Sequence, residues 1–60
     1  MEPIRTLVLD DEPVICEACR ECLAERGHSV DTRLTGREGL EAILQGNYEV
    51  ILLDMKLPDL

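Results

Sequence analysis

Apolar residues along the chain fall into two kinds of segment, short runs and longer stretches with helical spacing. Residues 4–9 form a short run that is apolar towards its end, which is typical of a β-strand. Residues 13–26 have apolar side chains at near-3.6 spacing, with Pro13 at the start and Gly27 just after the end, so they are expected to form a helix. The spacing predicts that one face of this helix packs inward, namely Ile15, Ala18, Cys19, Cys22 and Leu23.

The second half of the chain continues with a strand, a helix and a third strand. Residues 30–34 alternate between apolar and polar side chains, which is typical of a half-exposed strand at a sheet edge. Thr35 stands three residues before a glutamate, which matches a capping box, and the helix that follows is expected to reach about Gln45. Residues 49–54 are apolar on both faces before the closing aspartate. The residues of this second helix predicted to face inward are Leu40, Ile43 and Leu44.

The order of elements, β-α-β-α-β, indicates an α/β fold with a parallel sheet. Each crossover has a dozen or more residues, and such crossovers connect parallel strands in a right-handed sense. The first and third strands are nearly continuous apolar runs, as expected of strands that are covered on both faces. The second strand alternates and belongs at the edge. The predicted strand order is therefore 2-1-3.

The composition is that of a folded protein, and it argues against nucleic acid and membranes as partners. The 60 residues are 45% hydrophobic and 32% charged, but a chain this short buries only about 60% of its unfolded surface. The formal net charge of −7 argues against binding of nucleic acid through phosphate contacts. Apolar runs are too short to span a bilayer, and Met1-Glu2-Pro3 shows no basic leader segment, so no membrane partner and a cytoplasmic location are expected.

Three cysteines, Cys16, Cys19 and Cys22, have the C-x2-C-x2-C spacing of part of an iron–sulfur ligand run. No fourth cysteine follows, and the segment is rich in helix-forming residues. On a helix the three thiols spread over a broad arc instead of converging. Free cysteines in the core of a helix are the favoured interpretation.

Acidic residues follow both of the strands that are predicted to be neighbours. Asp10 and Asp11 end the first strand, and Asp54 ends the third. The carboxyl ends of parallel strands meet at one edge of a sheet, where open α/β sheets bind ligands. Carboxylates brought together repel each other unless a cation is held between them, and oxygen ligands without histidine favour Mg²⁺ or Mn²⁺. A solvated turn with a helix cap is the alternative, and the residues alone leave both open.

The two acidic segments together resemble a known family. The stretch Leu7-Val8-Leu9-Asp10-Asp11-Glu12-Pro13, followed some forty residues later by Val50-Ile51-Leu52-Leu53-Asp54-Met55-Lys56-Leu57-Pro58-Asp59-Leu60, is similar to the response-regulator receiver domain of two-component signalling. The resemblance implies a flavodoxin-like fold of five strands in order 2-1-3-4-5. Residues 1–60 would then be the N-terminal half of the domain, truncated after strand three.

The resemblance also implies a role for each matching residue. Asp54 corresponds to the phosphoacceptor, which takes a phosphoryl group from the phosphohistidine of a sensor histidine kinase. Asp11 corresponds to the direct ligand of Mg²⁺ (or Mn²⁺), and Asp10 to a ligand through water. The backbone carbonyl of Lys56 would complete the metal site, and Pro58 would shape the loop that carries it.

Two parts of the family pattern lie outside these sixty residues: a hydroxyl residue at the end of strand four and a lysine at the end of strand five. The resemblance therefore implies a phosphoacceptor signalling domain that passes its signal to an output domain or partner, not an enzyme, with transfer to Asp54 severely impaired in this chain alone. One alternative is a receiver-like module that is not phosphorylated and acts by homodimerisation or domain swapping through the edge of the third strand. A weaker alternative is a fragment of a flavodoxin-like metal hydrolase.

Overall fold

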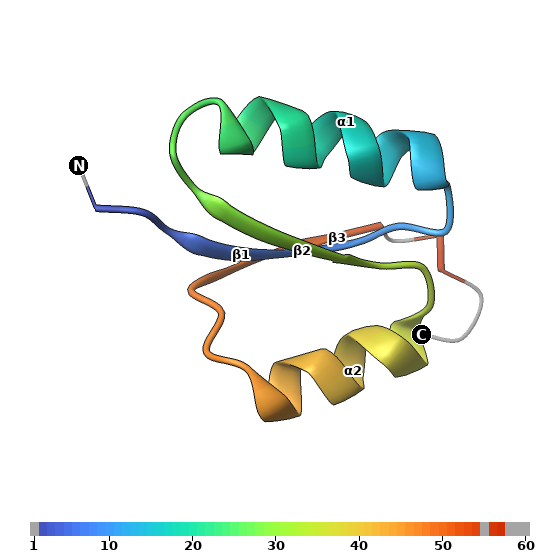
Figure 1. Cartoon of the computed structure of the whole chain (residues 1–60). Coiled ribbons are helices and arrows are strands. Elements are labelled where there is room, and N and C mark those ends of the chain that lie inside the picture. Colours follow the sequence, from blue (N-terminus) through green and yellow to red (C-terminus); the bar gives the residue numbers. More distant parts are fainter. Residues whose placement is uncertain (1, 55, 58–60) are drawn as a thin grey trace.

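The structure is a computed structural model that describes residues 2–54, 56 and 57. It has three strands and two helices in the described residues, and the helices lie on opposite faces of the sheet (Figure 1). In chain order the elements are β1 (Arg5–Leu9), α1 (Pro13–Ala24), β2 (Ser29–Arg33), α2 (Gly36–Gln45) and β3 (Val50–Leu53).

The sheet has the order β2-β1-β3, and β1 pairs in parallel with both neighbours. Thr6 pairs with Val30 on one side and with Val50 on the other, and the register continues without a break to the last residue of β1. The predicted α/β class and the predicted strand order 2-1-3 are confirmed, including the edge position of β2.

Both helices begin at the residues that the sequence indicates. Pro13 occupies the first turn of α1, where its missing N–H has no helical partner to lose. Gly27, which follows α1, has a φ of +85°, a conformation that glycine adopts without steric cost. At the start of α2 the Thr35 side chain accepts a hydrogen bond from the Glu38 N–H at 3.1 Å, so the predicted capping interaction is present.

The main hydrophobic core lies between the sheet and α2. Its buried members are Leu7, Leu9, Ala42 and Leu57, and Ile43 and Tyr48 pack against them. Tyr48 also connects β1 and β2, because its hydroxyl donates a hydrogen bond to Asp31 Oδ2 at 2.5 Å and its ring lies 5.3 Å from the Arg5 guanidinium carbon.

The inner face of α2 differs from the prediction. Leu40 and Leu44 were expected to face inward, but they are 57% and 78% exposed. The buried positions are the small residues Gly36, Gly39 and Ala42. A Cβ atom added at Gly39 would lie 2.0 Å from Leu9 Cδ2, so the helix approaches the sheet through glycine. Of the three large residues predicted to face inward, only Ile43 packs against the core.

The inner face of α1 also differs from the prediction. Cys16 is the buried residue of this helix, whereas Ile15 is 41% exposed. Among the other predicted residues Cys19 and Leu23 are half-buried, and Ala18 and Cys22 are exposed. The helix packs mainly on β2 and β1, so the side chains directed past β1 are left uncovered in the described part of the chain. All three cysteines are free, and within that part they form no shared group of metal ligands.

Strand β3 is apolar but is not covered as a central strand would be. Its four residues are 41–45% exposed, and its outer edge has no strand partner among residues 2–54, 56 and 57. The expectation that both faces of this strand are buried is therefore not met within the described chain. In that same portion, neither helix has the length and apolar character needed to cross a membrane.

Candidate functional site

The backbone ladder of the sheet continues one residue past β1 and β3 and so positions two of the acids. The Asp10 N–H donates to the Arg33 carbonyl at 3.2 Å. The Asp54 N–H donates to the Leu9 carbonyl at 2.9 Å. Asp10 and Asp54 are therefore held at the carboxyl edge of the sheet by main-chain bonds, independently of any contact between their side chains.

Three carboxylates meet at this edge. One oxygen from each of Asp10, Asp11 and Asp54 lies within 4.8 Å of the other two. Asp10 and Asp54 are half-buried, and Asp11 is exposed. The structure thus brings together the three acids that the sequence placed at the ends of neighbouring strands.

Local hydrogen bonds orient two of these carboxylates. Asp10 Oδ1 accepts the Glu12 N–H at 2.9 Å, and Asp54 Oδ1 accepts the Lys56 N–H at 2.9 Å. Each bond runs from the backbone two residues further on, an arrangement typical of aspartate in turns. A carboxylate can accept about four hydrogen bonds, so these contacts leave capacity for further ligands.

The loop after Asp54 is anchored by a residue that the sequence analysis did not single out as part of the site. Leu57 is buried in the core cluster, and its N–H donates to the Asp54 carbonyl at 3.3 Å. Lys56, which precedes it, is exposed. The apolar character of Leu57, directly after the charged Lys56, was the signal for this anchor. Pro58, the expected turn proline, lies outside the described residues.

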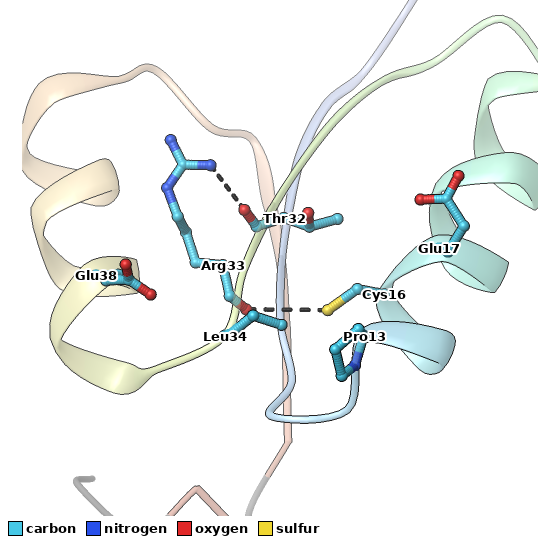
Figure 2. Close-up of a pocket in the computed structure, with 7 residues that line it drawn as sticks. All are labelled: Pro13, Cys16, Glu17, Thr32, Arg33, Leu34 and Glu38. Atoms are coloured by element: carbon cyan, nitrogen blue, oxygen red, sulfur yellow. Dashed lines mark hydrogen bonds between the residues drawn. The ribbon is translucent and has the colours of Figure 1, made fainter.

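Cys16 is a second residue of the site region that the helical spacing missed. Its thiol donates a hydrogen bond to the Asp10 carbonyl at 3.3 Å. Burial, and then the negative charge of Asp10, raise the pKa of the Cys16 thiol. The residue lies in the wall of an open cavity of about 350 Å³, lined by both helices and β2 (Figure 2).

The three acids fit a small divalent cation. Octahedral Mg²⁺ binds oxygen at about 2.1 Å, so adjacent ligand oxygens lie about 3 Å apart and opposite ones about 4.2 Å apart. A spread of up to 4.8 Å accommodates two direct carboxylate ligands and a third that binds through water. The donor set contains only carboxylate oxygens, which favours Mg²⁺ or Mn²⁺ over Zn²⁺.

The parallel sheet in the order β2-β1-β3, with helices on both faces and acids at its carboxyl edge, is that of the first half of a flavodoxin-like α/β fold. Residues 6–60 match the family described as the response regulator receiver domain. The chain belongs to this family.

Relatives with similar sequences are signalling proteins much longer than this chain. Over 55 residues the chain is 49% identical to the transcriptional regulatory protein DltR of Streptococcus agalactiae and 40% identical to the transcriptional regulatory protein TcrA of Mycobacterium tuberculosis. It is 35% identical over 57 residues to the aerobic respiration control sensor protein ArcB of Escherichia coli. The alignments cover 92%, 92% and 95% of this chain but 25%, 22% and 7% of the relatives. None of the solved structures matches the chain significantly.

Proposed function

We propose that residues 1–60 are the N-terminal half of a receiver domain in which Asp54 accepts a phosphoryl group from the phosphohistidine of a sensor histidine kinase. The observation that carries the proposal is the meeting of Asp10, Asp11 and Asp54 within 4.8 Å, in a chain of the receiver family. The role of each acid comes from its position in the family pattern.

In the proposed reaction a carboxylate oxygen of Asp54 attacks phosphorus. The new O–P bond forms as the P–N bond of the donor breaks, and the electron pair of that bond stays on the donor imidazole. Asp54 Oδ1 already accepts the Lys56 N–H, which restrains rotation of the carboxylate. We assign the attack to Oδ2, because Oδ1 keeps its backbone donor.

Asp11 and Asp54 would hold Mg²⁺ (or Mn²⁺) directly, Asp10 through water, and Lys56 through its backbone carbonyl. When bound, the ion supplies positive charge that offsets the charge on the transferring phosphoryl oxygens. The protein contributes preorganisation, since main-chain bonds already fix Asp10 and Asp54 before any ligand arrives. The burial of Leu57 holds the loop that presents Lys56.

The partners of the whole protein follow from the same proposal. Two relatives are named transcriptional regulatory proteins and a third a sensor protein, so receivers of this kind occur beside output and sensor modules. We propose a sensor histidine kinase as phosphoryl donor, an output domain or partner protein as target, and the cytoplasm as the site of the reaction. Completion of the domain would supply the hydroxyl residue and the lysine of the family pattern.

Beryllofluoride, a mimic of the phosphoryl group, tests this proposal in the full-length protein. Addition with Mg²⁺ should give a bound fluorine signal in the NMR spectrum and shift the Asp54 amide. The Asp54→Asn variant should give neither, and Glu41→Gln, an exposed acid on α2, should behave as the wild type. A fluorine signal that persists in Asp54→Asn would contradict the assignment of the phosphoacceptor.

A self-associating module is the second candidate, and the exposure of β3 favours it. Within residues 2–54, 56 and 57 the outer edge of β3 has no strand partner, and such an apolar edge can pair with the same strand of a second copy. In this case the sixty-residue chain would form a homodimer or a swapped assembly without phosphorylation. Sedimentation equilibrium at micromolar concentration tests this, and a folded 6.8 kDa monomer would exclude the module.

A further inference from the structure

We propose that Cys16 is a positioning residue for the metal-binding acids, acting through the peptide group that joins Asp10 to Asp11. The inference rests on the function proposed above and gives a role to a side chain that is not itself one of the acids. Cys16 is 4% exposed, and its thiol donates to the Asp10 carbonyl at 3.3 Å.

The orientation of the Asp10 carbonyl affects the position of Asp11, because this carbonyl belongs to the peptide group that joins the two residues. That group is planar, so the direction of its carbonyl also sets the direction in which the chain enters Asp11. The preceding peptide group is fixed by the bond from the Asp10 N–H to the Arg33 carbonyl. The sheet therefore holds the N–H of Asp10, and the thiol of Cys16 restrains its carbonyl group.

Three hydrogen bonds close a ring around the turn that carries Asp11. The Glu12 N–H donates to Asp10 Oδ1 at 2.9 Å, and the Cys16 N–H donates to the Glu12 carbonyl at 3.2 Å. The thiol of Cys16 completes the ring at the Asp10 carbonyl. Figure 2 shows the thiol directed from α1 towards β2, where it also lies 3.9 Å from the Arg33 carbonyl.

The Mg²⁺ affinity of the full-length protein, measured by calorimetry and by the amide shifts of residues 10–12, tests the proposal. Cys16→Ala should weaken Mg²⁺ binding by roughly tenfold, the lower end of the range for residues that orient metal ligands. Cys16→Val refills the space without a donor and should weaken binding similarly. Cys16→Ser restores a donor and should bind within roughly twofold of the wild type.

Cys22→Ala is the matched control, because Cys22 is an exposed cysteine on the same helix. Far-UV circular dichroism should be used to check that each variant is folded. If Cys16→Ala unfolds the protein, the comparison of Cys16→Ser with Cys16→Val still tests the proposal. Equal Mg²⁺ binding in all Cys16 variants, or failure of serine to restore it, would overturn the role of Cys16 and leave the metal site standing. Absence of Mg²⁺ binding in the full-length protein without substitutions would overturn the metal site and this inference together.

Discussion

Asp54→Asn should stabilise the metal-free fold, because it relieves repulsion among the three clustered acids. Two carboxylate charges 4.8 Å apart repel by about 0.9 kcal/mol in water, and by about 0.5 kcal/mol once physiological salt screens them. Asparagine removes two of the three pairwise repulsions and keeps an Oδ1 that accepts the Lys56 N–H. The free energy of unfolding should therefore rise by about 1 kcal/mol.

Mg²⁺ should reverse this order of stability. An ion that binds only the folded chain stabilises it by about 2.7 kcal/mol at one hundred times its dissociation constant. The asparagine variant has lost one carboxylate ligand and should gain much less. The wild type should then be the more stable protein, although it is the less stable one in the presence of a chelator.

Urea unfolding followed by far-UV circular dichroism measures the free energy of unfolding of both proteins, once with EDTA and once with saturating Mg²⁺. Glu2→Gln is the control, because it removes one negative charge from an exposed residue ahead of β1 and reports the general effect of lowering the net charge of −7. A loss of stability in metal-free Asp54→Asn would refute the repulsion argument. Equal stabilisation of both proteins by Mg²⁺ would show that Asp54 does not contribute to the metal site.

Three further substitutions test the framework around the site. Tyr48→Phe removes the hydroxyl that donates to Asp31 and should lower the free energy of unfolding by about 1 kcal/mol. The same bond raises the pKa of Tyr48. The stability that the bond adds to the folded chain is therefore fully present below the ordinary tyrosine pKa of about 10, and it is lost as the pH rises through the raised pKa. Tyrosinate absorbance follows this directly, since the chain has one aromatic residue, and an unshifted titration would count against the bond. Gly39→Ala should destabilise by about 1–3 kcal/mol in thermal unfolding, because its Cβ would overlap Leu9, and a gain in stability would contradict the close contact. Thr35→Ala should cost about 1 kcal/mol through loss of the helix cap, measured by urea unfolding, and no change would mean that the cap contributes nothing.

Strand order and the acidic cluster were predictable because both depend on the backbone. A parallel ladder places the residues that follow neighbouring strands at one edge, whatever their side chains are. The apolar runs of β1 and β3, together with the alternation of β2, therefore sufficed to predict that Asp54 lies beside Asp10. The capping motif at Thr35 was predictable for a similar reason, since it satisfies the first N–H groups of a helix locally.

The inner faces of the helices were predictable from apolar spacing only in part, since Ile43 packs against the core as expected but Leu40 and Leu44 do not. Spacing identifies large apolar side chains, whereas α2 contacts the sheet through Gly36, Gly39 and Ala42. Small residues on a helix give a weak hydrophobic signal even when they allow the closest packing. In α1 the position of Cys16 is set by the turn that begins at Pro13, and its hydrogen bond to the Asp10 carbonyl is a tertiary contact that no periodicity encodes.

The pairing of β1 with β3 is continuous, so the number of residues between Val50 and Asp54 matters to the site as much as the acidic side chains do. Side chains alternate between the faces of a strand, so a shift of the pairing by a single residue would turn Asp54 to the opposite face from its present partners. If the pairing of Thr6 with Val50 is kept, loss of one residue within Val50–Leu53 would therefore move Asp54 away from Asp10 and Asp11, although all three acids remain in the chain. An insertion between Gly46 and Asn47, ahead of Tyr48 and outside both strands, leaves the alignment of the two strands free to re-form.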